Sequence, residues 1–536
     1  MFKLLLCLCF FFCSELDEPQ VATRYGSLRG KWMESRNGKS FVGFEGIPFA
    51  KPPVGNRRFK DPESPDRWEG IRDALNPGQE CLQYDYLIIP GRVLGSEDCL
   101  YLSVYTPDIL FSNLLPVVVH FHGGAFEFGQ GQTLHGPEYL MDEKIVVVMV
   151  NYRLGPFGFL SFEDEDLPGN MGLKDQQLAL SWVRENIAVF GGHPKKVTIM
   201  GESAGGASVN YHLVSPLSKG LFHKAISMSG NAYSPWALVK SGIARERAMK
   251  TAEEAGCAYN GTKTTLQCLR TKNGTDIVSL RQQFTDELRD PLVYYGPVVD
   301  SKSEKPFLPD HPKKLTHHPV PWIVGISSGD GLLKTAVFTL SDPFGWNALN
   351  SELSDFIRKT LLYMQPVAGD DMLTDEIRQF YFNSGSLSND SLANMTNLFT
   401  DGWFWYPTTD AIAKHKEPVY IYYFDYLGKY SVIDLLGAKR PLNVAFHTDE
   451  LIYLFNSTAF FPALAGDDLI VSRSLVKLWT NFIKTGSPNT KDSILNWKKS
   501  IHNDYLHIHN GGYSMKTELL KERTDFWRNI TSKYNL

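Results

Sequence analysis

Two uninterrupted apolar runs constrain the fold of this chain more than any other feature. They read PVVVHFHG (116–123) and IVVVMVNYR (145–153), are rich in β-branched residues, and end in glycine or polar residues. A strand that is apolar on both faces is typical of the interior of a mostly parallel sheet. Further strands are predicted at 196–201, 224–230, 320–326 and 418–426. The chain is therefore expected to contain a large buried sheet.

Helical patterns separate these strands. The clearest covers 172–192, where apolar residues recur at helical spacing, at Leu178, Trp182, Val183 and Ile187. Alternation of strands and helices predicts an α/β fold, with a mostly parallel central sheet and helices on both faces. No linker rich in Pro, Gly or Ser divides the sequence, so residues 15–536 are expected to form one domain. Residues 335–415 are helix-rich by pattern and are expected to cap the sheet.

The charge balance excludes one broad class of function. The net charge is −5 and no basic run is present, whereas nucleic-acid binding requires a basic face that neutralises phosphates. The apolar fraction of 43% and the charged fraction of 21% describe an ordinary large globular protein. We expect no nucleic-acid partner.

The first residues have the pattern of a secretion signal. MFKLLLCLCFFFCS (1–14) has one Lys followed by about ten apolar residues, which is too short for a membrane span and has the size of a signal-peptide core. A buried N-terminal strand is the alternative. No second hydrophobic span follows. We therefore predict a signal peptide at about 1–14 and a secreted protein without a membrane anchor.

Cysteines and glycosylation motifs agree with secretion. Four cysteines lie beyond the predicted signal and allow three pairings, of which the pairing of neighbours is the simplest. That pairing joins Cys81 to Cys99 and Cys257 to Cys268. Six N-x-S/T motifs suit an extracellular surface, at Asn260, Asn273, Asn389, Asn394, Asn456 and Asn529.

The pattern G-x-S-x-G occurs twice, and only one copy has the surroundings of a nucleophile. A nucleophile elbow needs a strand before the serine and a helix after it. At 201–205 a strand-like KVTIM precedes and a helical SAGGASVNYHLV follows. Ser203 is therefore predicted to be a nucleophile rather than part of a plain turn. At 325–329 the strand runs into SSGDGLL, a turn, so this copy fails as an elbow.

A serine nucleophile also needs oxyanion donors and a base. HFHGGAF (120–126) ends a strand in small residues whose amides suit an oxyanion, with a simple glycine-rich turn as the alternative. Ala204, after the nucleophile, adds a further N–H. Elbows on α/β sheets are followed in the chain by the acid and then the histidine. His447 is predicted to be the base, and Asp330 to be the acid, in competition with several acidic residues in 286–447.

Longer segments resemble the type-B carboxylesterase and cholinesterase family. They include the active-site signature FGGHPKKVTIMGESAG (190–205) and a second signature, EDCLYLSVYTP (97–107). SGNAYSPWAL (229–238) is similar to secreted insect esterases, and the resemblance runs from about residue 20 to about residue 530. It implies an α/β-hydrolase fold with a catalytic site at the foot of a gorge, and chemistry that needs no metal or cofactor.

The resemblance also implies roles for individual residues. Ser203, Asp330 and His447 match the nucleophile, acid and base. The other matches are Gly124, Ala125 and Ala204 as oxyanion donors, Gly123 as a residue that shapes the donor loop, Glu202, Ser229 and Glu450 as a buried network that supports the histidine, and Arg153 with Asp175 as a structural salt bridge. The disulfides Cys81–Cys99 and Cys257–Cys268 are implied as well.

Three positions depart from the family pattern. The acid is Asp330 where most members have Glu, Ala125 replaces a glycine of the donor loop, and Val444 replaces a glycine before the histidine. The shorter acid requires its loop to sit closer to the histidine, and Val444 alters the expected path of the histidine loop. None of the three removes a catalytic group.

The expected activity is hydrolysis of a small-molecule carboxylic ester through an acyl-enzyme. The ester could be a xenobiotic, an odorant or pheromone, or a hormone. A juvenile-hormone-type esterase is the main alternative, although that group usually has Gln where this chain has Glu202. A non-catalytic adhesion or binding protein on the same fold is disfavoured because the triad is complete.

Aromatic residues bear on the pocket. A cholinesterase is disfavoured because residues 82–98 contain Tyr84 and Tyr86 but not the tryptophan that binds choline in that subgroup. Trp236 lies in the family's acyl-pocket segment and is predicted to limit acyl size. For the cluster DGWFWY (401–406), core packing is favoured over a place in the gorge.

Overall fold

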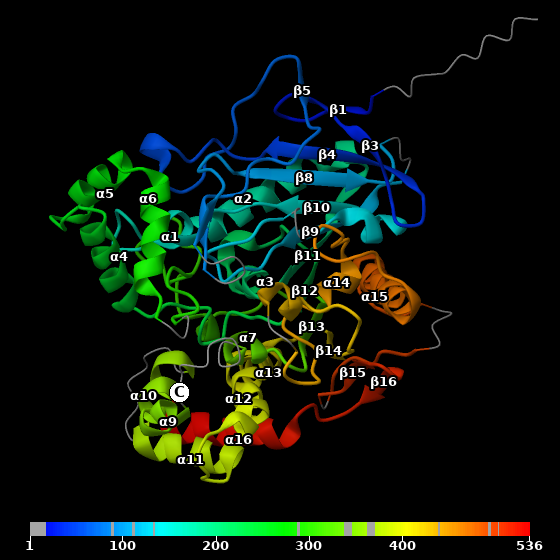
Figure 1. The fold of residues 1–536 in the computed structure, drawn as a ribbon. Coiled ribbons are helices and arrows are strands. Elements are labelled where there is room, and N and C mark those ends of the chain that lie inside the picture. The colour runs from blue at the N-terminus through cyan, green and yellow to red at the C-terminus, as the bar shows by residue number, and fades with distance from the viewer. Residues whose placement is uncertain are drawn as a thin grey trace, which may run out of the picture.

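The computed structural model describes residues 18–86, 91–109, 113–131, 135–286, 290–336, 346–361, 370–437, 440–490, 495–501 and 503–536. Within them, eleven strands form one central sheet in the order β16-β15-β14-β13-β12-β11-β9-β10-β8-β4-β3 (Figure 1). From β10 to β15 in this order all pairs are parallel, and the pairs at the two edges are antiparallel. The predicted α/β fold with a mostly parallel sheet is confirmed. The predicted signal peptide at 1–14 lies outside the described residues.

The strands of the central sheet are β3 (Lys31–Glu34), β4 (Ser40–Pro48), β8 (Tyr101–Thr106), β9 (Leu115–Phe121), β10 (Val146–Val150), β11 (Gly192–Glu202), β12 (Lys224–Met228), β13 (Trp322–Ser327), β14 (Val419–Asp425), β15 (Tyr505–His509) and β16 (Gly512–Lys516). Two small sheets contain β1 (Gln20–Ala22), β2 (Ser27–Arg29) and β5 (Ile71–Asp73), and β6 (Gln83–Asp85) and β7 (Arg92–Leu94). All six predicted strands are present, with ends shifted by a few residues.

Helices cover both faces of the sheet. On one face, α2 (Met171–Asn186) and α3 (Ala204–Val214) share a core with Val117 and Val119 of β9. On the other face, α14 (Leu451–Leu454) and α15 (Gly466–Thr485) share a core with Val118 of β9 and Met149 of β10. Because successive side chains of a strand point to opposite faces, both sides of β9 must be apolar. This arrangement explains the uninterrupted runs in the sequence.

The remaining helices flank the sheet. They are α1 (Gly155–Phe159), α4 (Ile243–Glu254), α5 (Thr262–Thr271), α6 (Gly274–Ser279), α7 (Leu332–Thr335), α9 (Trp346–Ser351), α10 (Leu353–Phe356), α11 (Asp370–Phe382), α12 (Leu392–Phe399), α13 (Tyr406–Lys414) and α16 (Lys521–Tyr534). Among the helices that the structure describes, none is long and apolar enough to cross a membrane.

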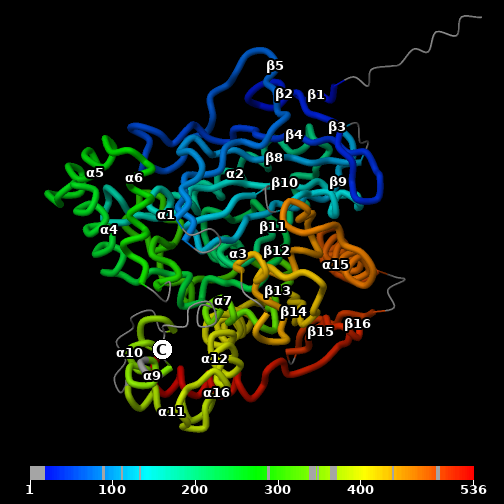
Figure 2. Tube along the Cα trace, in the orientation of Figure 1, coloured from blue at the N-terminus to red at the C-terminus, as the bar shows by residue number. Residues whose placement is uncertain are grey.

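The region 335–415 is mainly helical in its described parts, as predicted. α9, α11 and α12 lie together with α16 below β13 and β14 in Figure 1, and a π-helical turn (Thr400–Trp405) joins α12 to α13. Trp527 of α16 donates a hydrogen bond to the Tyr381 hydroxyl of α11 at 2.8 Å. The trace in Figure 2 shows the consequence: the helices of this region and the late helix α16 form one end of the molecule, opposite the N-terminal strands.

Candidate active site

Ser203 occupies a sharp turn between a strand and a helix. β11 ends at Glu202 and α3 begins at Ala204, so the predicted strand–turn–helix order is present. The Ser203 backbone has φ 55° and ψ −121°, a conformation that L-residues rarely adopt. Its amide donates to the Met228 carbonyl of β12 at 2.8 Å, and the Ala207 amide donates to the Ser203 carbonyl at 2.8 Å. These bonds hold the strained residue in place.

Close packing of the backbone requires the two glycines of the motif. A Cβ atom on Gly201 would lie 2.4 Å from the Gly205 carbonyl group, and a Cβ atom on Gly205 would lie 2.1 Å from the Phe121 carbonyl oxygen. The pattern at 201–205 thus follows from the approach of β11 and α3 to the end of β9. The start of α3 also places positive potential beside the Ser203 hydroxyl.

The second G-x-S-x-G copy leads to the predicted acid. β13 ends at Ser327, and the turn that follows places Asp330, which is completely buried, beside the histidine. The Oδ1 atom of Asp330 accepts a hydrogen bond from Nδ1 of His447 at 2.8 Å, and Oδ2 accepts one from the Ser327 amide at 3.2 Å. The structure therefore brings these two predicted residues together across 117 positions of sequence.

The acid loop and the histidine loop are bonded to each other. The Gly329 amide donates to the Ala445 carbonyl at 2.9 Å, and the Ala445 amide donates to the Ser328 hydroxyl at 2.9 Å. The Val444 side chain fills the space above Gly329, where a Cβ atom would lie only 2.3 Å from a Val444 methyl carbon. The loop path at Val444 is thus fixed by packing against a glycine, and the shorter Asp330 side chain reaches the histidine.

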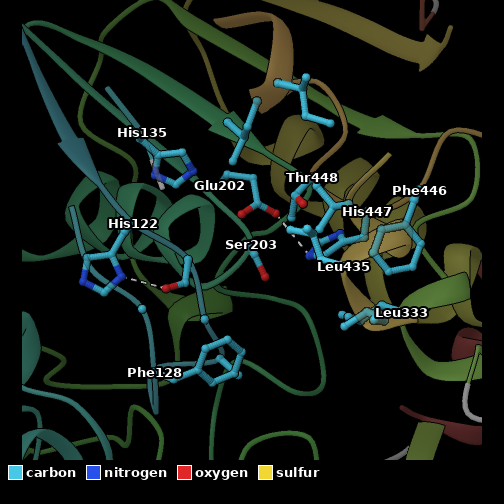
Figure 3. A pocket seen from close by; sticks show the side chains of 18 of the residues that line it. His122, Phe128, His135, Glu202, Ser203, Leu333, Leu435, Phe446, His447 and Thr448 are labelled. Atoms are coloured by element: carbon cyan, nitrogen blue, oxygen red, sulfur yellow. Dashed lines mark hydrogen bonds and ion pairs between the residues drawn. The ribbon is translucent and has the colours of Figure 1, made fainter. Parts of the chain in front are cut away.

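The second ring nitrogen of His447 faces Glu202. Nε2 lies 3.1 Å from Oε1 of Glu202, but the two atoms are not aligned for a hydrogen bond, and neither has a hydrogen-bond partner within the described residues. No hydrogen bond joins Ser203 to His447 in that part of the chain. Figure 3 shows the Ser203 hydroxyl, the Glu202 carboxyl and the His447 ring facing one cavity. The three groups share one site, with Nε2 turned toward the glutamate.

A buried polar network extends behind the histidine. Glu450 accepts hydrogen bonds from the hydroxyls of Ser327 and Tyr422, both at 3.0 Å. The Ser229 hydroxyl accepts a hydrogen bond from the Ser327 amide at 3.3 Å. The structure therefore links Ser229 to Glu450 through Ser327, whereas Glu202, within the described residues, meets this network at His447.

Burial changes the ionisation of the two glutamates. Burial, together with repulsion from the nearby Asp330, raises the pKa of Glu450 to about 7. Burial also raises the pKa of Glu202 well above its usual range, with added repulsion from Glu450 and Asp330. Ionising all three buried carboxyl groups, those of Glu202, Asp330 and Glu450, would carry a large free-energy cost. The protonated form of Glu202 is therefore favoured.

The predicted oxyanion loop follows β9. Gly124 has φ 106° and Ala125 has φ 54°, so the backbone here turns in a left-handed sense. A Cβ atom on Gly124 would lie 1.9 Å from the Phe128 carbonyl oxygen, which explains this glycine, while Ala125 tolerates its conformation. Within the described residues the amides of Gly124 and Ala125 donate to no protein group. Gly123, Gly124 and Ala125 all line the cavity that Ser203 faces.

The rest of the cavity wall is largely apolar. Trp236 lines it as predicted, and its indole N–H donates to the Trp403 carbonyl at 3.1 Å. The aromatic side chains of 401–406 are buried and do not line the cavity, in agreement with the core-packing interpretation. The apolar residues that line it are Phe128, Leu292, Leu333, Val432, Leu435, Leu436, Phe446, Leu451, Ile452, Phe460 and Phe461.

Sequence reasoning missed Asp449, which fixes two sides of this cavity. Its carboxylate accepts hydrogen bonds from the Ser431 hydroxyl at 2.8 Å, the Val432 amide at 2.7 Å and the Phe446 amide at 2.8 Å. It thereby joins the 432–436 turn to the histidine loop. The available signal was an acidic residue two positions after His447, which no motif distinguishes from a surface residue.

The other predicted features lie away from the cavity. Both predicted disulfides, Cys81–Cys99 and Cys257–Cys268, are present. Arg153 and Asp175 form a buried salt bridge at 2.7 Å. Five glycosylation motifs have an exposed asparagine and one, Asn456, a half-buried one. No group of His, Cys, Asp or Glu in the described residues could hold a metal ion.

Comparison with known proteins agrees with the geometry. The model of a family described as "Carboxylesterase family" matches residues 17–527. Esterase FE4 of Myzus persicae is 36% identical over 499 residues, which cover 90% of this chain and 87% of the relative. Juvenile hormone esterase of Tribolium castaneum is 38% identical over 507 residues, covering 90% and 86%. Venom carboxylesterase-6 of Apis mellifera is 36% identical over 540 residues, covering 96% and 95%.

Proposed function

The chain belongs to the carboxylesterase family and is a carboxylic ester hydrolase, and we propose that it acts through an acyl-enzyme formed on Ser203. In this proposal His447 is the general base and Asp330 orients it. The observation that carries the assignment is the 2.8 Å hydrogen bond from His447 to a fully buried Asp330, beside a strained serine at an elbow.

The chemistry starts with proton transfer from Ser203. Because Nδ1 of His447 donates to Asp330, Nε2 carries the lone pair that accepts the serine proton. Nε2 must exchange its contact with Glu202 for one with the Ser203 hydroxyl, and catalytic hydrogen bonds commonly tighten only when substrate binds. The neutral form of Glu202, favoured by its raised pKa, places no full negative charge beside the Nε2 lone pair.

The oxygen of the tetrahedral intermediate would lie against the amides of Gly124, Ala125 and Ala204. Each such donor contributes about 10²- to 10³-fold in rate in enzymes of this kind. His447 then donates its proton from Nε2 to the leaving alcohol, the C–O bond breaks, and the acyl group remains on Ser203. Water attacks the acyl-enzyme by the same route, releases the acid, and restores the serine.

We also propose secretion and an uncharged substrate. Two disulfides and exposed glycosylation motifs suit an extracellular protein. A choline substrate is disfavoured because Tyr86 does not line the cavity and its ring is covered by the Arg281 guanidinium at 4.3 Å. The juvenile hormone esterase relative supports a hormone ester as a second candidate, while Glu202 still departs from the Gln usual in that group.

The deciding experiment compares Ser203→Ala with wild type on aryl esters of increasing acyl length. Loss of the nucleophile should lower kcat by at least about 10⁴-fold and should abolish the mass increase that an organophosphate leaves on Ser203. Ser208→Ala, a buried serine in α3 outside the cavity, is the matched control and should remain active. Undiminished turnover or labelling in Ser203→Ala would disprove the mechanism. The acyl length with the highest activity measures the size of the pocket that Trp236 lines.

A further inference from the structure

Two buried histidines, His120 and His135, pack against each other at one wall of the cavity. His120 is the polar residue in the apolar run of β9, and it is completely buried. His135 is 7% exposed, and its ring centroid lies 5.2 Å from that of His120. The Phe455 ring packs on both, at 4.8 and 5.1 Å. Neither histidine has a role in the proposed ester chemistry.

Nitrogen atoms of this pair lack hydrogen bonds. In the described part of the chain, neither ring nitrogen of His120 has a partner, and Nδ1 of His135 has none. Burial lowers the pKa of His135 to about 3, with a further contribution from His122, so its ring is neutral at neutral pH and offers one donor and one acceptor. Buried polar groups in native proteins nearly always have a partner. A polar atom from outside the protein would supply it.

His135 faces the cavity and is held there by its backbone. It lines the same cavity as Ser203 and His447. The next residue, Gly136, forms two backbone hydrogen bonds with Asn456, at 2.9 and 3.0 Å, which tie His135 to the segment after α14. The neighbouring wall is apolar, with Ile452 and Phe461. A hydrogen-bonding group in such a wall discriminates more strongly than one in a polar wall.

The position of His135 relative to His447 bears on the alcohol portion of the ester. The leaving oxygen must receive its proton from Nε2 of His447, which lies against Glu202. In the view of Figure 3, the Glu202 side chain lies between the His447 and His135 rings. Trp236, which the family resemblance places in the acyl pocket, and the oxyanion loop also line this cavity. In the proposed mechanism, an alcohol portion that extends past Glu202 would reach His135.

We infer that His135 is a specificity-determining residue that hydrogen-bonds an oxygen atom in the alcohol portion of the substrate. The substrate class is an otherwise apolar ester whose alcohol carries a hydroxyl, ether or carbonyl oxygen. The inference rests on the proposed function of Ser203 and His447. His120 supports the His135 ring from behind and does not reach the cavity.

The test uses heptyl butyrate and its ether isosteres, in which an oxygen replaces one CH₂ of the heptyl chain at successive positions. The wild type should prefer one isostere, with kcat/KM about tenfold above heptyl butyrate, the effect of one net hydrogen bond. In His135→Phe the ratio of the two kcat/KM values should fall by about tenfold, mainly through KM. His135→Gln, which keeps a donor and an acceptor, should restore part of the ratio.

Phe455→Leu is the control for packing. This substitution reduces the packing against the His135 ring without removing a hydrogen-bonding group. The ratio of kcat/KM for the preferred isostere to kcat/KM for heptyl butyrate should therefore be retained, even if the protein is less stable. The inference is overturned if the wild type prefers no isostere, or if His135→Phe lowers kcat/KM equally for heptyl butyrate and its isostere. Equal loss would mean that ordered water satisfies the ring. Ser203→Ala separates the two hypotheses, because its loss of turnover on every ester tests the mechanism alone.

Discussion

At the scale of single residues, the 2.8 Å hydrogen bond between Nδ1 of His447 and Asp330 leaves Nε2 as the nitrogen that acts as the base in the proposed mechanism. The proposed acid, Asp330, is one methylene shorter than the Glu of most family members, and it still reaches the histidine. The Gly329 amide donates a hydrogen bond to the Ala445 carbonyl. The Val444 side chain occupies the space that a side chain at position 329 would need. The two departures from the family pattern, Asp330 and Val444, thus lie on two loops that pack against each other.

Asp330→Asn should lower kcat by about 10³- to 10⁴-fold, because the amide no longer holds His447 in the correct tautomer. Asp330→Glu, which restores a carboxylate on a longer side chain, should retain more activity than the asparagine variant. Single-turnover acylation with an aryl ester measures both. Asp425→Asn is the control, since Asp425 pairs with His507 at 3.2 Å and lies outside the cavity. Full activity in Asp330→Asn would show that another residue is the acid.

At the scale of elements, the first disulfide loop supports the oxyanion loop. The Gln83 side chain accepts from the Gly129 amide at 2.7 Å and donates to the Gly129 carbonyl at 3.2 Å. The Gln130 side chain donates to Glu80 at 2.6 Å. Cys81 lies between Glu80 and Gln83 in the sequence. Its disulfide bond to Cys99 therefore anchors the two side chains that bond the cavity-lining residues Gly129 and Gln130. The second disulfide joins the end of α4 to α5, neither of which lines the cavity.

Removal of the two disulfides should therefore have different results. A Cys81→Ser/Cys99→Ser variant should lose about tenfold or more in kcat/KM, because the oxyanion donors lose their support. A Cys257→Ser/Cys268→Ser variant should lose roughly 2–4 kcal/mol of unfolding free energy with kcat/KM nearly unchanged. Steady-state kinetics and denaturant unfolding of the two variants provide the comparison. Equal kinetic losses would show that the oxyanion loop needs no such anchor.

The sequence predicted the elements of the sheet better than those of the helical region. Uninterrupted apolar runs identify buried strands because both faces are covered, and the strand–turn–helix context identified the elbow at Ser203. For 335–415 only the helical character was predictable. The π-helical turn at Thr400–Trp405 inserts an extra residue per turn, so the apolar spacing no longer follows one helical period. Asp449 and His135 were missed because their importance depends on long-range contacts.

At the scale of the whole molecule, burial keeps several histidines neutral. Burial lowers the pKa of His212, His135 and His317 to about 3 and that of His122 to about 4. Each of these rings binds a proton in the unfolded chain below about pH 6.5 but not in the folded one. Their contribution to stability is therefore lost as the pH falls from 6.5 toward 4. Glu450 and Asp449, with pKa values raised to about 7, act in the opposite direction over this range.

His212 isolates the histidine contribution. Its ring is completely buried and bonds to the Ser218 hydroxyl at 2.7 Å and the Gln176 amide oxygen at 3.1 Å. Between pH 6 and 4 the unfolding free energy of wild type should fall, relative to His212→Gln, by up to about 1.4 kcal/mol per pH unit. Denaturant unfolding at a series of pH values measures this difference. Parallel pH curves for the two proteins would show that His212 is not kept neutral by folding.

The distance along the chain between the parts of the site affects how the protein is made. Ser203, Asp330 and His447 leave the ribosome in that order, but β15, β16 and α16 are synthesised later. Trp405 of the π-helical turn donates a hydrogen bond to Thr524 of α16 at 2.9 Å, so the helices next to the acid loop are completed by a segment that is translated after His447. Contacts of such long range form late. The growing chain therefore carries all three side chains of the proposed triad before α16 can complete these contacts.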